Sequence, residues 1–308
     1  MNRIDACFQR LRAEGRTAFI PFLTAGDPDP ETTVALVEAC ARAGASIIEL
    51  GFPYSDPVAD GPTIQNSYSR TLSHGLRLDD VFGLVRLSRK RTDVPLAGMA
   101  SYSLVFRRGL TRFVGEAAES GLDGLIVPDL PVEEAEPLTK ACREAGVAAI
   151  SLVAPTTTPE RRRRIAEHAT GFIYCVSVVG TTGAREGLPE GLIASLADLR
   201  RLTDKPLAVG FGISRPEQAA ALAPHADGVI VGSAIVRLIA ETESPPSPTP
   251  LPVGAPPGRG KGEGRRPPAR PGNRRGRGPT PRSAIVLAVE RYVAEMVKAL
   301  EAVRKPTH

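Results

Sequence analysis

Eight short apolar segments alternate with amphipathic segments along this 308-residue chain, and the alternation restricts the possible folds more than any other feature. The apolar segments have the length of buried strands, and the segments between them repeat apolar residues at helical spacing. The predicted strands are 18–23, 47–50, 95–99, 124–127, 148–153, 172–176, 206–209 and 228–231. The predicted helices are 31–43, 78–89, 111–120, 133–145, 159–168, 193–202 and 216–222, with one more at 4–14 and a last one at 284–302.

These counts predict an α/β fold, a single (β/α)8 TIM barrel domain over residues 1–308 with an extra N-terminal helix. A doubly wound parallel sheet is the alternative. We favour the barrel because no GxGxxG motif follows the first strand and because glycines and polar residues follow several strands. In a barrel, the C-terminal ends of all strands meet at one face, where the active sites of barrel enzymes lie.

Glu49 is an acid within an apolar strand, where an apolar residue is expected. Strand side chains alternate, so Glu49 shares a face with Ile47 and Gly51. Burial disfavours an ionised carboxyl and raises its pKa, and in this way a glutamate becomes a proton donor near neutral pH. Asp60 follows in a loop rich in Pro and Gly, which we expect to return to the same end of the strand. We therefore predict two catalytic carboxylates.

Both acids also have structural interpretations. Glu49 could cap a backbone group or pair with an arginine, because buried acids usually have a partner. Asp60 precedes a glycine and could be an ordinary turn residue.

Glycine clusters follow the last two predicted strands. GFGIS spans 210–214, and GSAIV spans 232–236 and runs directly into a helical segment. Glycine lets backbone N–H groups approach an anion, and a helix that begins near Ser233 adds the positive end of its dipole. Since barrel enzymes often bind phosphate at these two strands, the clusters predict a phosphate site. Glycines that only form turns are the alternative.

The sequence argues against several other kinds of chemistry. The four cysteines and four histidines show no CxxC, HxH or HExxH spacing, so we expect no metal site. No lysine falls at the catalytic end of a predicted strand, which disfavours Schiff-base chemistry. What remains is acid and base catalysis by carboxylates on a phosphorylated substrate. The chain shows no targeting segment and no apolar run long enough to span a bilayer, so we expect a cytoplasmic protein.

Five motifs follow one another along the chain: PFLTAGDP (21–28), ELGFPYSDPVADGPTIQ (49–65), VPDLPVEE (127–134), GFGIS (210–214) and GSAIV (232–236). They stand in the same order in tryptophan synthase alpha subunits, and the chain resembles that family. The resemblance runs from about residue 1 to 239 and resumes at 284–300. It implies a lyase of L-tryptophan biosynthesis that cleaves indole-3-glycerol phosphate to indole and glyceraldehyde 3-phosphate by a retro-aldol reaction.

The same resemblance assigns roles to individual residues. Glu49 protonates the indole carbon that bears the glycerol phosphate chain, Asp60 holds the indole N–H, and Thr182 packs against that aspartate. Two loops, 53–59 and 179–187, close over the substrate. The further substrate-binding positions are Phe22 and Tyr174 at the indole and Gly183, Gly212, Gly232 and Ser233 at the phosphate.

The resemblance also implies a partner. The family works as an α2β2 heterotetramer, in which indole passes through a tunnel to a beta subunit that carries pyridoxal phosphate, so no cofactor is expected in this chain. Ser101 and Ser103 stand where the family usually has a tyrosine and an asparagine near the beta contact. Serine lacks the amide that donates and accepts at once, so we expect altered activation by the beta subunit.

Residues 242–282 depart from the family. They are rich in Pro, Gly and Arg and have too few apolar side chains to bury, which predicts a disordered insert before the last helix. From 244 to 282 the chain carries nine basic residues and one acid, a charge of +8, which leaves −3 elsewhere in a chain of net charge +5. An arginine-rich loop suggests the alternative function, a catalytically idle barrel that activates a partner or binds RNA. The insert has no aromatic residues to stack on bases, so we expect no nucleic-acid partner.

Overall fold

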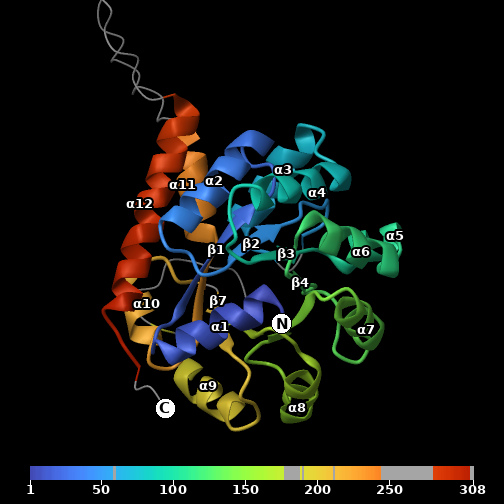
Figure 1. Cartoon of the computed structure of the whole chain (residues 1–308), viewed down its shortest axis with the longest axis vertical. Helices are drawn as coiled ribbons and strands as arrows, with labels where there is room; N and C mark the ends of the chain where they lie inside the picture. Colours follow the sequence, from blue (N-terminus) through green and yellow to red (C-terminus); the bar gives the residue numbers. More distant parts are fainter. Residues whose placement is uncertain (58–59, 177–187, 189–190, 211, 244–279, 306–308) are drawn as a thin grey trace, which may run out of the picture.

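The computed structural model describes residues 1–57, 60–176, 188, 191–210, 212–243 and 280–305, and its strands form a closed barrel (Figure 1). All eight strands are parallel and pair in chain order, and β8 returns to β1 so that Ala18 pairs with Gly228. The strands are β1 (Ala18–Thr24), β2 (Ile48–Gly51), β3 (Leu96–Met99), β4 (Gly124–Ile126), β5 (Ala148–Val153), β6 (Ile173–Val176), β7 (Leu207–Gly210) and β8 (Gly228–Val231). The predicted (β/α)8 barrel is confirmed.

Helices surround this barrel, and one of them precedes β1 as expected. They are α1 (Arg3–Ala13), α2 (Pro30–Arg42), α3 (Pro62–Ser73), α4 (Leu78–Arg89), α5 (Tyr102–Arg108), α6 (Leu110–Ser120), α7 (Glu136–Glu144), α8 (Pro159–His168), α9 (Leu192–Arg200), α10 (Pro216–Leu222), α11 (Ser233–Glu243) and α12 (Pro281–Glu301). The sequence did not predict α3 or α5. Only one side of α3 is buried, through Ile64, Ser67, Tyr68 and Thr71, and this mixed set gives a weak apolar period.

The alternation along the strands separates two apolar layers. Ile48 and Leu50 pack between the barrel and its helices, whereas Ile47 belongs to the layer inside the barrel. The apolar face of α1, including Ile4 and Phe8, joins this inner layer. Glu49 therefore lies on the inner side of β2, because it alternates with the two outward residues.

The terminal helix α12 packs along α11 and α2 (Figure 1). Thr280 caps it by accepting a hydrogen bond of 3.3 Å from the Ser283 N–H, and Pro281 occupies its first turn. The predicted insert bounds, 242–282, are therefore too wide at both ends. Thr242 still belongs to α11, where its hydroxyl donates to the Leu238 carbonyl at 2.7 Å, and residues 281–282 begin α12. Residues 244–279 lie outside the described part of the chain.

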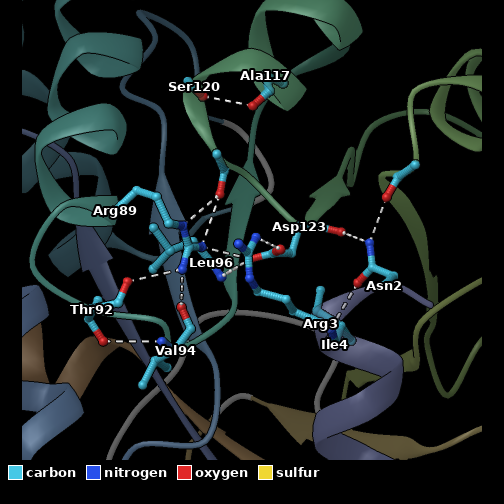
Figure 2. A network of polar contacts seen from close by, with 12 residues as sticks. Asn2, Arg3, Ile4, Arg89, Thr92, Val94, Leu96, Ala117, Ser120 and Asp123 are labelled. Carbon is cyan, nitrogen blue, oxygen red and sulfur yellow. Dashed lines mark hydrogen bonds and ion pairs between the residues drawn. The ribbon is translucent and has the colours of Figure 1, made fainter.

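A buried aspartate joins the N-terminal ends of β3 and β4 (Figure 2). The carboxylate of Asp123 accepts hydrogen bonds from the Leu96 N–H at 2.9 Å, from Arg89 at 2.7 Å and from Arg3 at 3.0 Å. The Asn2 side chain donates to the Asp123 carbonyl at 2.7 Å. This cluster ties α1, the end of α4 and two strands to one side chain.

The same arrangement recurs four strands later. Asp227, which precedes β8, accepts from the Leu207 N–H at 2.9 Å and from Arg200. Residues 89–96 and 200–207 share the pattern RxxTDxPL, so each arginine reaches its aspartate from the same relative position. The two clusters hold opposite sides of the barrel at its N-terminal face.

Asp123→Asn is expected to lower the free energy of unfolding by about 3 kcal/mol, because two arginines then lose their buried anion. Urea unfolding at neutral pH measures the effect. Asp198→Asn is the matched control, since Asp198 pairs with Arg201 on an exposed surface and should contribute less than about 1 kcal/mol. Equal losses in the two variants would contradict a special role for the Asp123 cluster.

Candidate active site

A pocket of about 790 Å³, its open mouth included, lies at the C-terminal end of the barrel. The structure brings seven of the predicted site residues to its wall: Phe22, Glu49, Asp60, Tyr174, Gly212, Gly232 and Ser233. Thr182 and Gly183, together with the loop 179–187, lie outside the described residues. The wall is completed by Gly61, Ile64, Met99, Ile213, Ser214, Ile230, Ala234 and Arg237.

Glu49 is held inside the barrel by strand pairing with Phe22 on one side and Ala97 on the other. It is fully buried, and neither of its carboxyl oxygens has a hydrogen-bond partner among the described residues. Burial, and then the negative charge of Asp60, raise the pKa of Glu49 to about 8. At neutral pH the side chain is therefore mostly a neutral acid that points into the pocket with a proton to give.

Asp60 reaches the pocket from the loop between β2 and α3. The side-chain amide of Gln65, in the first turn of α3, donates to the carbonyls of Asp60 at 2.7 Å and Pro57 at 3.1 Å. Further along α3, Arg70 forms two hydrogen bonds of 3.1 and 2.7 Å with the buried carboxylate of Asp27. Helix α3, which was missed in the sequence, thus links the Asp60 loop to the end of β1.

The surroundings of Asp60 shift its pKa less than those of Glu49. Burial raises the pKa of Asp60, a hydrogen bond from the Tyr54 hydroxyl lowers it, and the charge of Asp129 raises it, with a result of about 6. At pH 7 Asp60 is mostly ionised while Glu49 is mostly neutral. Two neighbouring carboxyl groups whose pKa values are pushed apart can act as a proton donor and as an anion in the same site.

Aromatic rings and aliphatic side chains form the walls between these acids. The Phe22 ring crosses over Gly51, where an added Cβ would lie 2.3 Å from the Phe22 Cζ. The Tyr174 hydroxyl lies against Gly210, where an added Cβ would lie 2.5 Å from its oxygen. Glycine at these strand ends therefore gives the rings their space. Ile64, Met99 and Ile230 add apolar surface, and the result suits a flat aromatic group.

The opposite end of the pocket is made of backbone. Helix α11 begins at Ser233, and its first helical bonds run from the N–H groups of Ile235 and Val236 to the Gly232 carbonyl at 2.9 and 3.1 Å. The N–H groups of Ser233 and Ala234 precede these bonds, so helix geometry leaves them for an anion. Gly212, with φ +79°, adopts a left-handed conformation at the end of β7 that favours glycine.

Several residues of the site could have been found in the sequence but were not. Met99 and Ile230 occupy inward positions by the same alternation that placed Glu49. Arg237 follows Ser233 by one helical turn, which places it on the same helix face. Tyr54 gives no such signal, because only the folded loop places its hydroxyl beside Asp60.

Ser101 and Ser103 lie on the rim of the barrel at α5. Ser101 caps this helix by accepting a hydrogen bond of 3.2 Å from the Ser103 N–H, and it donates to Asp129 at 2.7 Å. Ser101 therefore holds Asp129, whose charge acts on Asp60. The effect of the two serines on a beta partner stays a prediction.

Two further features are absent from the described residues. No group of three or more His, Cys, Asp or Glu side chains there is arranged to hold a metal ion. None of the helices in that part of the chain has the length and apolar composition needed to cross a membrane.

Comparison with known proteins identifies the family of this chain. A family model described as tryptophan synthase alpha chain matches residues 8–248. The chain is 50% identical over 244 residues to the tryptophan synthase alpha chain of Rhodopirellula baltica, covering 78% of this chain and 88% of the relative. It is 49% identical over 242 residues to that of Synechocystis sp., covering 78% of this chain and 92% of the relative.

Solved structures give the same result. A tryptophan synthase alpha chain from Legionella pneumophila superposes with a TM-score of 0.79 at 33% identity, covering 98% of each chain. A chain of the tryptophan synthase complex from Pyrococcus furiosus superposes with a TM-score of 0.69 at 40% identity, covering 73% of this chain and 91% of the other. The chain therefore belongs to the tryptophan synthase alpha chain family, which consists of lyases of tryptophan biosynthesis.

Proposed function

We propose that this pocket cleaves indole-3-glycerol phosphate into indole and glyceraldehyde 3-phosphate. One observation carries the proposal: Glu49 is fully buried, has no hydrogen-bond partner among the described residues, and shares an apolar pocket with a second carboxyl and a helix N-terminus. The cleavage needs a proton donor, an anion near the indole nitrogen and a phosphate site. The pocket offers a candidate for each.

The reaction balances with the two acids alone. Glu49 gives its proton to the indole carbon that bears the side chain, and positive charge develops at the ring nitrogen. Asp60 accepts a hydrogen bond from the indole N–H and stabilises this charge inside a site with little water. The carbon–carbon bond then breaks, its electron pair returns to the ring, and the neighbouring hydroxyl loses a proton as it becomes the aldehyde. Ionised Glu49 takes up that proton, so no net proton is consumed.

Binding is divided between the two ends of the pocket. Phe22 and Tyr174 contact the indole, and Gly212, Gly232 and Ser233 hold the phosphate through backbone N–H groups and the Ser233 hydroxyl. Burial, together with the charges of Glu49 and Asp60, keeps the pKa of Tyr174 far above neutral, so this side chain stays an uncharged phenol. Thr182, Gly183 and the loops 53–59 and 179–187 complete the site by closing over the substrate and excluding water.

We also propose a partner and a location. The chain works with a tryptophan synthase beta subunit in an α2β2 heterotetramer in the cytoplasm, and pyridoxal phosphate belongs to that subunit. The Pyrococcus furiosus relative comes from a tryptophan synthase complex, which supports a beta partner. This chain needs no cofactor of its own, since the proton transfers proposed above use only its side chains.

Indole release tests the proposal directly. The purified chain should release indole from indole-3-glycerol phosphate without any partner. The release should be faster when the cognate beta subunit is added. If no indole were released either with or without the beta subunit, the lyase activity would be refuted and the catalytically idle barrel favoured. None of the described contacts supports that alternative.

Tyr292 on α12 supports the phosphate end of the pocket. Its hydroxyl donates to the Ser214 carbonyl at 2.8 Å, and the Ser214 N–H donates to Gln218 at 2.9 Å, so Ser214 is held from both sides. Tyr292→Phe removes one of these bonds. We expect the KM for indole-3-glycerol phosphate to rise about threefold to tenfold while kcat changes less than twofold, because one neutral hydrogen bond positions the loop. A loss confined to kcat would contradict this role.

A further inference from the structure

The pocket wall carries little positive charge to set against the negative charge of the proposed substrate. Among the described residues of its wall, Glu49 and Asp60 are acidic, and Arg237 is the one that carries a cationic side chain. A phosphate monoester brings about −1.5 to −2 near neutral pH. The N-terminus of α11 offers only about +0.5 to set against it. A full positive charge at this end of the pocket would therefore contribute strongly to binding.

Helix geometry directs Arg237 toward the first turn of α11. The residue lies four positions after Ser233, so the two share one face of the helix. Helical side chains lean toward the N-terminus of their helix, so we expect the Arg237 guanidinium to lie near the N–H groups of Ser233 and Ala234. The side chain is exposed and lines the pocket, so it is accessible to a ligand there.

Arg237 also differs from other arginines that have an acid one turn away. Arg42 pairs with Glu38 at 3.4 Å, and Arg112 pairs with Glu116 at 2.9 Å. Glu241 follows Arg237 at the same spacing, yet within the described residues Arg237 makes no hydrogen bond or ion pair. Its charge is therefore not neutralised by the part of the protein that the structure describes.

We infer that Arg237 is a phosphate ligand of this site and that it favours a dianionic phosphate monoester over uncharged analogues. The guanidinium binds the phosphate oxygens that face the pocket mouth, while the N–H groups of α11 bind those that face the helix. Arginine suits this position because its planar guanidinium group can donate two parallel hydrogen bonds to a phosphate. The inference rests on the proposed function for the identity of the substrate.

The test compares wild type, Arg237→Gln and Arg237→Lys. For Arg237→Gln, we expect the KM for indole-3-glycerol phosphate and the Kd for inorganic phosphate, from calorimetry, each to rise about tenfold to hundredfold, the effect of losing one charge-assisted hydrogen-bonded pair. The kcat should change less than threefold, and Arg237→Lys should recover most of the phosphate affinity. The Kd for indole, which is uncharged, should not change. Raising the salt concentration should weaken phosphate binding more in wild type than in Arg237→Gln.

Arg291→Gln provides the control for net charge, because Arg291 is exposed on α12 and is not part of the pocket wall. It should leave both constants unchanged. If Arg237→Gln bound phosphate as well as wild type while both released indole, the role of Arg237 would be wrong and the proposed function would stand. If wild type bound phosphate but released no indole, the proposed function would fail independently of Arg237. Equal losses in Arg237→Gln and Arg291→Gln would show a nonspecific charge effect and overturn the inference.

Discussion

Glu49→Gln is expected to lower kcat for indole release by about 10²–10⁴-fold, the range for removing a general acid. Glutamine keeps the size of the side chain but has no proton to give to the indole ring. The single-turnover rate with indole-3-glycerol phosphate measures this loss without interference from product release. Glu167→Gln on the exposed face of α8 is the control and should retain wild-type activity.

The pH dependence of the wild type gives a second measure of the same residue. Since burial raises the pKa of Glu49 to about 8, the fraction of neutral acid falls as the pH rises through that value. We expect kcat/KM to decline above about pH 8 for this reason. A rate that kept rising beyond pH 9 would contradict Glu49 as the proton donor.

The stability of the fold should also depend on the protonation of Glu49. The pKa of Glu49 is about 8 in the folded chain and 4.5 when exposed, so between these values the folded state holds a proton that the unfolded state has lost. The contribution of Glu49 to the free energy of unfolding therefore falls as the pH rises from about 4.5 to 8, by on the order of 5 kcal/mol.

Glu49→Gln removes this penalty and should be more stable than wild type above pH 8, with little difference below pH 4.5. Urea unfolding of both proteins at pH 5 and pH 8.5 measures the change. A difference that does not depend on pH would mean that Glu49 is not held neutral in the folded chain.

Asp60→Asn has the second largest expected effect, a loss of about 10²–10³-fold in kcat/KM, as for other groups that stabilise transition-state charge. Asparagine still offers an oxygen to the indole N–H, but it lacks the negative charge that opposes the charge on the nitrogen. Asp56→Asn is the matched control, because Asp56 lies exposed in the same loop and interacts with its neighbour Ser55 at 2.8 Å. Both variants are assayed without the beta subunit.

The acid side of the pH profile distinguishes this role from a structural one. The pKa of Asp60 is raised to about 6, so its carboxylate is lost as the pH falls through that value. The wild type should show a bell-shaped profile with limbs near pH 6 and pH 8, and Asp60→Asn should lose the limb near pH 6. If that limb stayed in Asp60→Asn, another group would be responsible for it.

Particular residues show why some predictions succeeded and others did not. The inward position of Glu49 followed from strand alternation, because Ile48 and Leu50 must face the helices if the barrel is to bury them. Helix α5 has only seven residues, of which Val105 alone is buried, so its sequence contains no apolar period to detect. The bounds of the predicted insert erred by a few residues because Thr242 extends α11 and the Thr280 cap starts α12 before the apolar pattern begins.

The roles of the two acids depended on both kinds of information. Local chemistry and spacing in the sequence determined the eight-stranded barrel, the acid in its second strand and the glycines at its last two strands, because periodicity acts over a few neighbouring residues. The tertiary structure alone decided that Tyr54 and Asp129 act on Asp60, that α12 holds Ser214, and that Arg237 borders the same pocket as Glu49. These contacts join segments that are far apart in the chain. The electrostatic environment of a buried group depends on all such neighbours together, and the local sequence pattern does not contain them.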